Sequence, residues 1–383
     1  MKMIYLDHNA TTPVRKEVIE AMNTALSKHF GNPSSFYAIA RQARSVLELS
    51  RRRVAESIGA EPEEIIFTSG GSESDNMALR GVARALKKKG RHIITSSIEH
   101  HAILNTCKDL QKDGYRVSYL PVDSQCRVDP SQVEKNITAE TVLISLMCAN
   151  NETGVIQPHE QIGTIAREHG IMFHTDAVQA VGKIPFDVKD LSVDLVSISG
   201  HKIYGPKGVG ALYIRRGTPI CPTITGGPQE NGLRAGTENI PAIVGFAEAA
   251  GLAANTLNEQ ARKTAELRDF LEAEIFKRLD AVSLNGGAVA RLPNTTNICF
   301  EGVDGESILL HLDLMGICAS SGSACSMVSA ETSHVLMAMG IDPRTAQGSI
   351  RFSLGKDNTK QEIGATLDAL AKIVARLRAI SSL

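Results

Sequence analysis

The stretch 171–202, IMFHTDAVQAVGKIPFDVKDLSVDLVSISGHK, contains two short apolar runs that are each followed by polar residues. The runs 171–175 and 193–198 predict two β-strands. Asp176 stands at the tip of the first strand, and Lys202 lies just beyond the second, in a loop of small residues. Ligands of open α/β sheets collect at the carboxyl ends of the strands. We therefore expect the Asp176 carboxylate and the Lys202 amine to face one crevice.

Short apolar runs alternate with helix-forming stretches on both sides of this segment. The expected strands are 65–68, 92–95, 117–120, 141–147, 171–175, 193–198 and 209–214, and the expected helices are 75–89, 102–112 and 160–169. Such alternation is typical of a mostly parallel sheet with helices on both faces. After Pro241 the pattern changes to a long helical stretch, 240–279, then from residue 295 onward to strands at 297–300 and 349–354, further helices, and a final helix at 360–378. The chain is therefore predicted to be an α/β protein with a second, smaller α+β domain.

The composition limits the classes of protein to which the chain can belong. A length of 383 residues suggests two domains. The formal net charge is −1 and the chain has no Trp, so neither nucleic acid nor an anionic membrane is expected as a partner. The start, MKMIYLDHNATTP, lacks the apolar core of a signal peptide, and no apolar stretch is expected to reach membrane-spanning length, since Glu248 interrupts the most apolar one, 240–252. We expect no membrane-spanning segment and a cytoplasmic location.

Two common kinds of site are excluded by spacing. No C-x-x-C pair occurs among the seven scattered cysteines, which are Cys107, Cys126, Cys148, Cys221, Cys299, Cys318 and Cys325. This argues against a disulfide framework and against a preformed zinc site. The stretch 200–208, GHKIYGPKG, differs from a nucleotide P-loop because Pro206 follows the second glycine where a lysine is needed. A nucleoside triphosphatase is therefore excluded.

Lys202 and Asp176 are the two kinds of group that pyridoxal phosphate needs from a protein. An amine forms a Schiff base with this cofactor, and a carboxylate keeps its pyridine nitrogen protonated. The segment 68–73, TSGGSE, joins a strand to a helix, where backbone N–H groups and the positive end of the helix would face the cofactor phosphate. Two structural alternatives stay open: a solvated lysine with a capping aspartate, and an ordinary glycine turn with Ser72 as N-cap.

Four further side chains have types that suit an amino-acid site. His101 can lie on a pyridine ring or shuttle a proton, and Asn151 can bind a ring oxygen or a carboxylate. Arg351, inside an apolar strand, can bind a substrate carboxylate. Cys325 lies in a run of tiny polar residues, 320–326, where an exposed thiol is a competent nucleophile. The alternatives are a helix-start histidine, an asparagine turn, a structural ion pair and an incidental exposed cysteine.

The order of short motifs resembles that of the cysteine desulfurases of the class V aminotransferase group, of the iron–sulfur cluster and nitrogen-fixation type. The motifs are YLDHNATTP (5–13), GNPSS (31–35), FTSGGSESDN (67–76), IEHHA (98–102), NNETG (150–154), HTDAVQ (174–179), SGHKIYGPKG (199–208), LRAGTEN (233–239), SSGSACS (320–326) and IRFSLG (350–355). Each motif alone is weak. Together they cover nearly the whole chain in sequence, which makes a chance match implausible.

The resemblance implies a fold-type I pyridoxal-phosphate enzyme with a mostly parallel seven-stranded sheet in its large domain. The large, cofactor-binding domain would span 14–256. Residues 1–13 and 257–383 would form the small α+β domain, which would carry a catalytic cysteine loop at about 318–332. The resemblance also implies a homodimer.

The same resemblance implies a role for individual residues. Lys202 would carry the cofactor as a Schiff base, His101 would stack on its ring, and Asp176 would pair with its nitrogen. The other implied cofactor contacts are Gln179 and Asn151 near the ring hydroxyl, Gly71, Ser72, Ser199 and His201 at the phosphate, and Thr237 at the phosphate of the neighbouring subunit. The implied substrate contacts are Arg351, Asn151 and Asn32. Cys325 would accept the sulfur as a persulfide, and it is also a candidate transient ligand of an iron–sulfur cluster.

The implied reaction converts L-cysteine to L-alanine and passes sulfur through Cys325 to an iron–sulfur scaffold or another sulfur-acceptor protein. The final acceptor stays open among general cluster assembly, a nitrogenase-specific role and tRNA thiolation. A selenocysteine lyase or an aminotransferase of the same fold is one alternative, with Cys325 incidental. A non-enzymatic sulfur carrier that uses only the loop thiol is another, and the combination of Asp176, Gln179 and Lys202 weighs against it.

Some positions depart from the usual pattern of this group. Phe36-Tyr37 and then Ala38 to Ala40 stand where many relatives carry a histidine and later a glycine. Pro228 and Asn231 stand where a glycine and an arginine are frequent, which removes one positive charge near the expected dimer or partner surface. Met327-Val328 replace smaller residues after the thiol. None of these changes removes a catalytic group.

Overall fold

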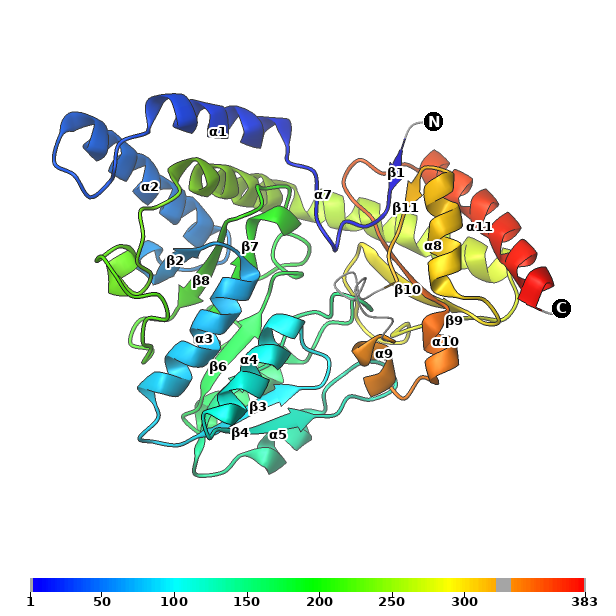
Figure 1. Cartoon of the computed structure of the whole chain (residues 1–383), viewed down its shortest axis with the longest axis horizontal. Helices are drawn as coiled ribbons and strands as arrows, with labels where there is room; N and C mark the ends of the chain where they lie inside the picture. Colours follow the sequence, from blue (N-terminus) through cyan, green and yellow to red (C-terminus); the bar gives the residue numbers. More distant parts are fainter. Residues whose placement is uncertain (1–2, 322–331, 382–383) are drawn as a thin grey trace.

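A seven-stranded sheet forms the centre of the larger part of the chain in this computed structural model, which describes residues 3–321 and 332–381 (Figure 1). The strand order is β2 (Ile65–Thr68), β8 (Gly210–Ile214), β7 (Leu195–Ser199), β6 (Met172–Asp176), β5 (Thr141–Ser145), β3 (His92–Ser96) and β4 (Arg116–Leu120). Only β8 is antiparallel to its neighbours within this sheet. The predicted mostly parallel seven-stranded sheet is therefore confirmed.

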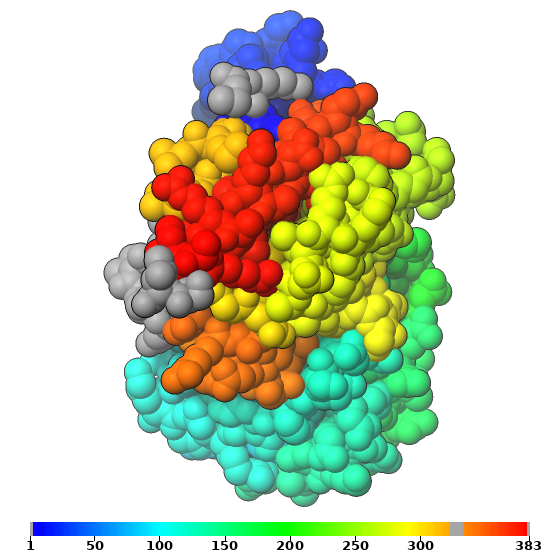
Figure 2. All heavy atoms as spheres, turned by 90° about the vertical axis from the view of Figure 1, so that its right-hand side faces the viewer, coloured from blue at the N-terminus to red at the C-terminus, as the bar shows by residue number. Residues whose placement is uncertain are grey.

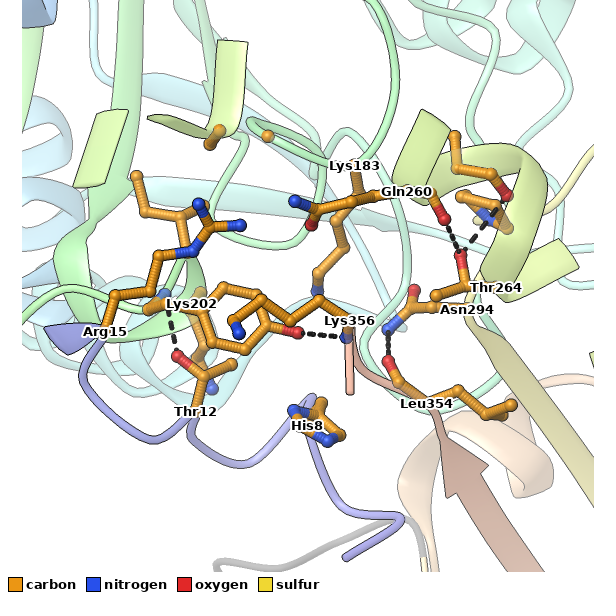
Figure 3. A pocket seen from close by; sticks show the side chains of 16 residues that line it. His8, Thr12, Arg15, Lys183, Lys202, Gln260, Thr264, Asn294, Leu354 and Lys356 are labelled. Atoms are coloured by element: carbon orange, nitrogen blue, oxygen red, sulfur yellow. Dashed lines mark hydrogen bonds between the residues drawn. The ribbon is translucent and has the colours of Figure 1, made fainter. Parts of the chain in front are cut away.

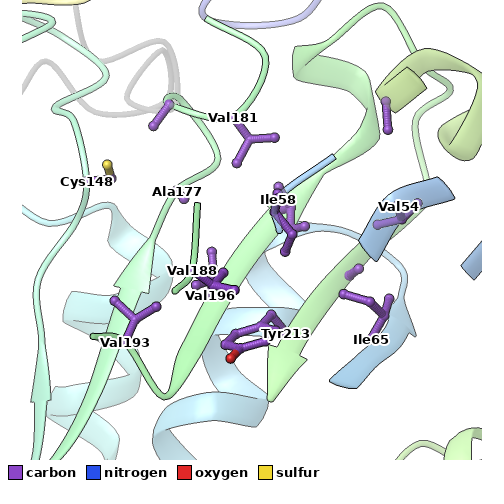
Figure 4. Packing of buried hydrophobic residues seen from close by; sticks show 14 of the residues in the cluster. Val54, Ile58, Ile65, Cys148, Ala177, Val181, Val188, Val193, Val196 and Tyr213 are labelled. Carbon is purple, nitrogen blue, oxygen red and sulfur yellow. The ribbon is translucent and has the colours of Figure 1, made fainter. Parts of the chain in front are cut away.

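Helices cover both faces of this sheet because its strands alternate apolar side chains between the faces. Ile66 and Ile93 pack against α3 and α4, whereas Ile65 and Ile94 belong to a second cluster on the opposite face. Figure 4 shows Ile65, Val196 and Tyr213 from the strands near Val54 of α2 and Ile58, which follows that helix. The covering helices are α1 (Lys16–Lys28), α2 (Ala38–Glu56), α3 (Gly71–Ala85), α4 (His101–Lys112), α5 (Pro130–Asn136), α6 (His159–Glu168) and the first half of α7.

A smaller unit has its own apolar cluster and two small sheets. The antiparallel sheet is β12 (Ser349–Ser353), β10 (Thr295–Phe300) and β9 (Val282–Leu284), and the parallel pair is β1 (Ile4–Tyr5) and β11 (Ile317–Cys318). Because β1 pairs with β11, and the His8 N–H donates to the Ser353 carbonyl, the N-terminal segment belongs to this unit. Its helices are α8 (Gly305–Leu314), α9 (His334–Ala338), α10 (Pro343–Gln347) and α11 (Lys360–Ser381).

One helix, α7 (Ile240–Arg278), connects the two units. Its first half contributes Ile243 and Phe246 to the core beside the large sheet, and its second half contributes Leu271 and Ile275 to the core of the small unit. Figure 1 shows it running from one unit to the other, and Figure 2 shows its C-terminal half beside α11. By length and hydropathy alone α7 could cross a membrane, so the expectation that no stretch reaches that length is wrong. Its apolar side chains instead pack against α1, α2 and α11.

The sequence located most strands of the large sheet to within one or two residues, but it misplaced some ends. Helix α3 begins at Gly71 rather than at residue 75, because the small residues after Gly70 already adopt helical geometry. Strand β5 ends at Ser145 rather than at residue 147. The elements that the pattern did not predict include α1, α2, α5, β1, β9, β11 and the 3-10 turns Pro62–Glu64, Gly200–Lys202 and Glu230–Gly232, while the helices expected after residue 295 are α8, α9 and α10.

Truncating α7 in the core of the small unit should destabilise the protein. Leu271 is fully buried there, so Leu271→Ala is expected to lower the free energy of unfolding by about 2–5 kcal/mol. Phe276→Ala, five residues later on a side chain that is 47% exposed, is the matched control. Denaturant unfolding of the two variants measures the difference, and equal losses would contradict the assigned core.

Candidate active site

A cavity of about 330 Å³ lies at the carboxyl ends of the central strands, where they meet the N-terminal segment and β12. Its walls include most of the residues that the sequence singled out, namely Gly71, Ser72, His101, Asn151, Asp176, Gln179, Ser199, His201, Lys202 and Arg351. These residues are far apart in the chain. The parallel sheet brings them together because its carboxyl ends share one edge.

Asp176 and Lys202 lie at the ends of two adjacent strands of the sheet. Asp176 is the last residue of β6, and Lys202 ends the 3-10 turn that directly follows β7. The Lys202 Nζ donates hydrogen bonds to the backbone carbonyls of Asn9 and Ala10, the latter at 2.8 Å. Asp176 is 7% exposed, and its Oδ1 accepts a hydrogen bond from the Val178 N–H at 2.9 Å. Burial raises the pKa of Asp176 to about 6, while this hydrogen bond and Lys202 oppose the shift.

The N-terminus of α3 forms one side of the cavity. Gly70 precedes it with a φ of 150°, a conformation that favours glycine. A Cβ on Gly71 would lie 2.8 Å from the Val178 Cγ2, so the loop after β6 approaches the helix too closely for a larger residue. Ser72 follows in the first turn, and Ser199 and His201 also line the cavity. Unpaired helix N–H groups beside hydroxyl and imidazole groups suit a bound phosphate.

His101, Asn151 and Arg351 line the cavity from three other elements. His101 begins α4, and its ring centroid is 4.8 Å from that of His334. Arg351 lies on β12 and is 1% exposed. Its Nη1 donates to the Asn151 carbonyl at 3.0 Å, and its Nη2 is 2.7 Å from the Asp7 Oδ1. The structural ion pair considered for Arg351 is thus present, and it holds the guanidinium in the cavity wall.

Two of the predicted site residues that the structure describes do not line this cavity. Asn32 and Thr237 are exposed, and neither lines it within the single chain. Their loops meet at a separate cavity lined by Pro33, Ser34, Pro228 and Asn231 among others. Asn231 has a φ of 57°, which asparagine tolerates better than most residues. Cys325, like Met327 and Val328, lies outside the described residues.

Several cavity residues were not predicted as site residues from the sequence. Asn9, Asp75, Glu152 and His334 all line it. Asn9 lies inside the motif YLDHNATTP and Asp75 inside FTSGGSESDN, so the motifs carried a signal that the search for reactive side chains overlooked. Asn9 is 1% exposed and bonds to both structural units, so its contribution depends on tertiary contacts.

Buried carboxyl groups surround the base of the cavity. Burial raises the pKa of Asp75 well above its usual value, and the Asp176 charge adds to the rise. Burial also raises the pKa of Glu99 to about 8, against hydrogen bonds that the Glu99 Oε1 accepts from the Ser96 hydroxyl and the Met147 N–H. At neutral pH the Glu99 carboxyl is therefore largely protonated. Glu152, which accepts a hydrogen bond from the Ser333 hydroxyl, has its pKa raised by the same cause.

The part of the chain that the structure describes contains no preformed metal-binding site. Within residues 3–321 and 332–381, no group of three or more His, Cys, Asp or Glu side chains is placed to hold a metal ion. The transient cluster ligand suggested at Cys325 lies outside that part and stays a prediction.

Comparison with known proteins identifies the family. The family model described as Aminotransferase class-V matches residues 4–365. A cysteine desulfurase IscS of Dictyoglomus turgidum is 54% identical over 378 residues, which cover 99% of this chain and 96% of that protein. The chain belongs to the class V aminotransferases, among the cysteine desulfurases. This confirms the family that the motifs predicted.

Solved structures agree with this assignment of the cysteine desulfurase fold. A NifS-like protein superposes with a TM-score of 0.92 at 41% identity, covering 98% of this chain and 100% of that chain. A structure described as SspA in complex with cysteine superposes with a TM-score of 0.83 at 39% identity, covering 93% of this chain and 100% of that chain. The fold-type and the two-unit arrangement of helices and sheets are thus shared over nearly the whole length.

The raised pKa of Glu99 predicts a specific dependence of stability on pH. A carboxyl that is protonated more readily in the folded state stabilises it most below its unfolded pKa, and that stabilisation is lost as pH rises towards 8. Glu99→Gln mimics the protonated form, so its stability relative to wild type should rise by about 1.4 kcal/mol per pH unit between pH 6 and 8. Urea unfolding at both pH values measures the difference.

The exposed Glu160 on α6 provides the control for that measurement. Glu160→Gln should give the same stability difference from wild type at both pH values. If Glu99→Gln behaved as Glu160→Gln does, the Glu99 carboxyl would be ionised in the folded protein and the assignment would be wrong.

Proposed function

We propose that this cysteine desulfurase uses pyridoxal phosphate to convert L-cysteine to L-alanine and transfers the sulfur to Cys325. The observation that carries the proposal is that Asp176 ends one strand and Lys202 follows the adjacent strand, and that both line one cavity. An amine and a buried carboxylate beside a helix N-terminus form the donor set that this cofactor needs. The relatives named as cysteine desulfurases support the same reaction.

The described side chains fit the cofactor at each of its polar groups. Lys202 would carry it, and Asp176 would hold a proton on its ring nitrogen. Gly71, Ser72, Ser199 and His201 would bind its phosphate, and His101 would stack on its ring. Gln179 and Asn151 would face the ring hydroxyl. All of these residues line one cavity, which supports the proposal without testing it.

The chemistry divides between the cofactor and the residues of the chain. When bound, pyridoxal phosphate withdraws electrons from the α-carbon of an attached amino acid. Arg351 would bind the carboxylate of L-cysteine, and the Lys202 amine would move its α-proton. The Cys325 thiolate would attack the substrate sulfur, so that an S–S bond forms and the substrate C–S bond breaks. The bonding electrons remain with the carbon fragment, which takes up protons and leaves as L-alanine.

The full site would need a homodimer. Thr237 and Asn32 are exposed and lie away from the cavity of their own chain, so we propose that Thr237 contacts the cofactor phosphate of the neighbouring subunit and that Asn32 helps to bind substrate. We further propose a large domain of 14–256, and a small domain of 1–13 and 257–383. The separate apolar cores around the two halves of α7 support this division.

The persulfide sulfur would pass to an iron–sulfur scaffold or another sulfur-acceptor protein in the cytoplasm. The acceptor protein is to be identified by capture with the persulfide-loaded enzyme. The names of the relatives support the donor reaction more directly than the choice of acceptor.

Substitution of the two proposed reactive residues should separate cofactor binding from sulfur transfer. Cys325→Ala should keep the visible absorbance of bound cofactor but lose production of alanine and sulfide from L-cysteine by more than about a thousandfold. Lys202→Ala should lose both. Cys221→Ala, which removes another partly exposed thiol, should match wild type in both measurements.

Two outcomes would favour the other functions. Unchanged alanine production by Cys325→Ala would favour an aminotransferase or a selenocysteine lyase. A purified wild-type protein without visible absorbance, on which Lys202→Ala has no effect, would favour a sulfur carrier.

Subunit complementation tests the shared site. Mixed dimers of a Lys202→Ala chain and a Thr237→Val chain contain one site with both wild-type residues if Thr237 acts across the interface. Co-expressed and separated by two affinity tags, they should recover about half of wild-type activity, since one of two sites is intact. Activity no higher than that of the separate variants, or a monomeric protein, would contradict a contribution of Thr237 in trans.

A further inference from the structure

Lys183 is a second lysine close to Lys202. It lies in the wall of a small cavity of about 30 Å³ that Lys202, His8 and Tyr204 also line. Figure 3 shows Lys183 between Gln260 of α7 and the N-terminal segment with His8 and Thr12. Among the residues that the structure describes, no carboxylate lies within 4.0 Å of the Lys183 Nζ. The buried position of the Lys183 amine is therefore not explained by a salt bridge.

The partners of Lys183 are two side-chain amides. Its Nζ donates to the Gln179 Oε1 at 2.5 Å and to the Asn9 Oδ1 at 3.2 Å. Successive turns after β6 bring Gln179 and Lys183 side by side, because residues four apart in helical turns are neighbours. Burial lowers the pKa of Lys183 well below its usual value, and the charges of Lys202 and Arg351 lower it further.

These contacts determine which way the Gln179 amide points. The Lys183 Nζ donates to the Gln179 Oε1, so the amide oxygen is on the side that faces Lys183. On the other side, the Gln179 Nε2 donates to the Asn9 backbone carbonyl at 3.0 Å, and a carbonyl can only accept. Both partners therefore agree on one orientation. Gln179 is 6% exposed and lines the large cavity, so its remaining N–H is available to a ligand there.

We propose that Lys183 is a positioning residue that holds the Gln179 amide with its N–H donor side towards the ring hydroxyl of the bound cofactor. This inference rests on the proposed function, because it requires pyridoxal phosphate in the cavity. The hydrogen bond from the Lys183 amine also polarises the amide, and a polarised amide is a stronger donor to the ring oxygen. Lys183 thus acts on the cofactor through Gln179 and makes no contact with the substrate.

Substitution of Lys183 should weaken cofactor binding without weakening the fold. Lys183→Met keeps the length of the side chain and removes its donors. We expect the dissociation constant for pyridoxal phosphate to rise about tenfold, since a hydrogen bond to a charged group contributes on this scale. The thermal unfolding midpoint of the apoprotein should change little, because relief from burying an amine without an acidic partner offsets the loss of its hydrogen bonds to Gln179 and Asn9. The matched control is Lys189→Met, whose side chain is 66% exposed.

A double-mutant comparison tests whether Lys183 acts through Gln179. Gln179→Leu should weaken cofactor binding, and Lys183→Met combined with Gln179→Leu should bind no more weakly than Gln179→Leu alone. The pH at which the visible absorbance of the bound cofactor changes should shift in the same direction in both single variants. If the two losses of cofactor affinity multiplied in the double variant, the proposal would be overturned. Wild-type cofactor affinity in Lys183→Met would also overturn it.

A separate substitution decides the case in which the Lys183→Met apoprotein does not fold. Gln179→Glu keeps an acceptor for Lys183 but removes the donor, so a folded protein with weakened cofactor binding is expected. Wild-type affinity in Gln179→Glu would overturn the role assigned to Lys183. Absence of cofactor binding by the wild-type chain would overturn the proposed function itself, which distinguishes the two failures.

Discussion

The hydrogen bonds of Asn9 connect the two units at the edge of the sheet where the candidate site lies. Its backbone carbonyl accepts hydrogen bonds from Lys202 and Gln179, which follow β7 and β6 of the large sheet. Its own amide donates to Thr295 on β10 of the small unit, and its N–H donates to Ser353 on β12. Because these partners belong to both units, the positions of Lys202 and of Arg351, on the same β12, depend on one buried residue near the start of the chain.

The sheet places opposite charges where a charged cofactor and an amino acid can both be held. Asp176 ends one strand, Lys202 follows its neighbour, and the N-terminus of α3 opens beside them. Burial disfavours an ionised Asp176, and a protonated ring nitrogen would supply the positive charge that the carboxylate lacks. The Arg351 guanidinium is also buried, and its ion pair with Asp7 already holds it in place. The cavity is therefore arranged before any ligand binds.

The sequence was a good guide wherever a single local signal was sufficient. Apolar runs located the strands that end at Asp176 and Ser199, and glycine-rich motifs located the start of α3 near Gly71. The helices α1 and α2 were missed because they precede the β-α alternation on which the prediction relied. Asn9 and Lys183 were missed as site residues for another reason. Asn9 stands in a motif that the search for reactive side chains overlooked, and the importance of both residues comes from contacts between segments more than 100 residues apart. The placement of Thr237 and Asn32 outside the cavity shows equally that one chain does not form every predicted contact.

The most direct test of this account is the covalent attachment of the cofactor. Borohydride reduction of the cofactor-loaded protein converts an imine into a stable amine, and peptide mapping by mass spectrometry then locates the modified lysine. The account predicts a single modification at Lys202, with Lys183 unmodified despite its place beside the same network. A modified Lys183, or a loaded protein with no modified lysine, would contradict it.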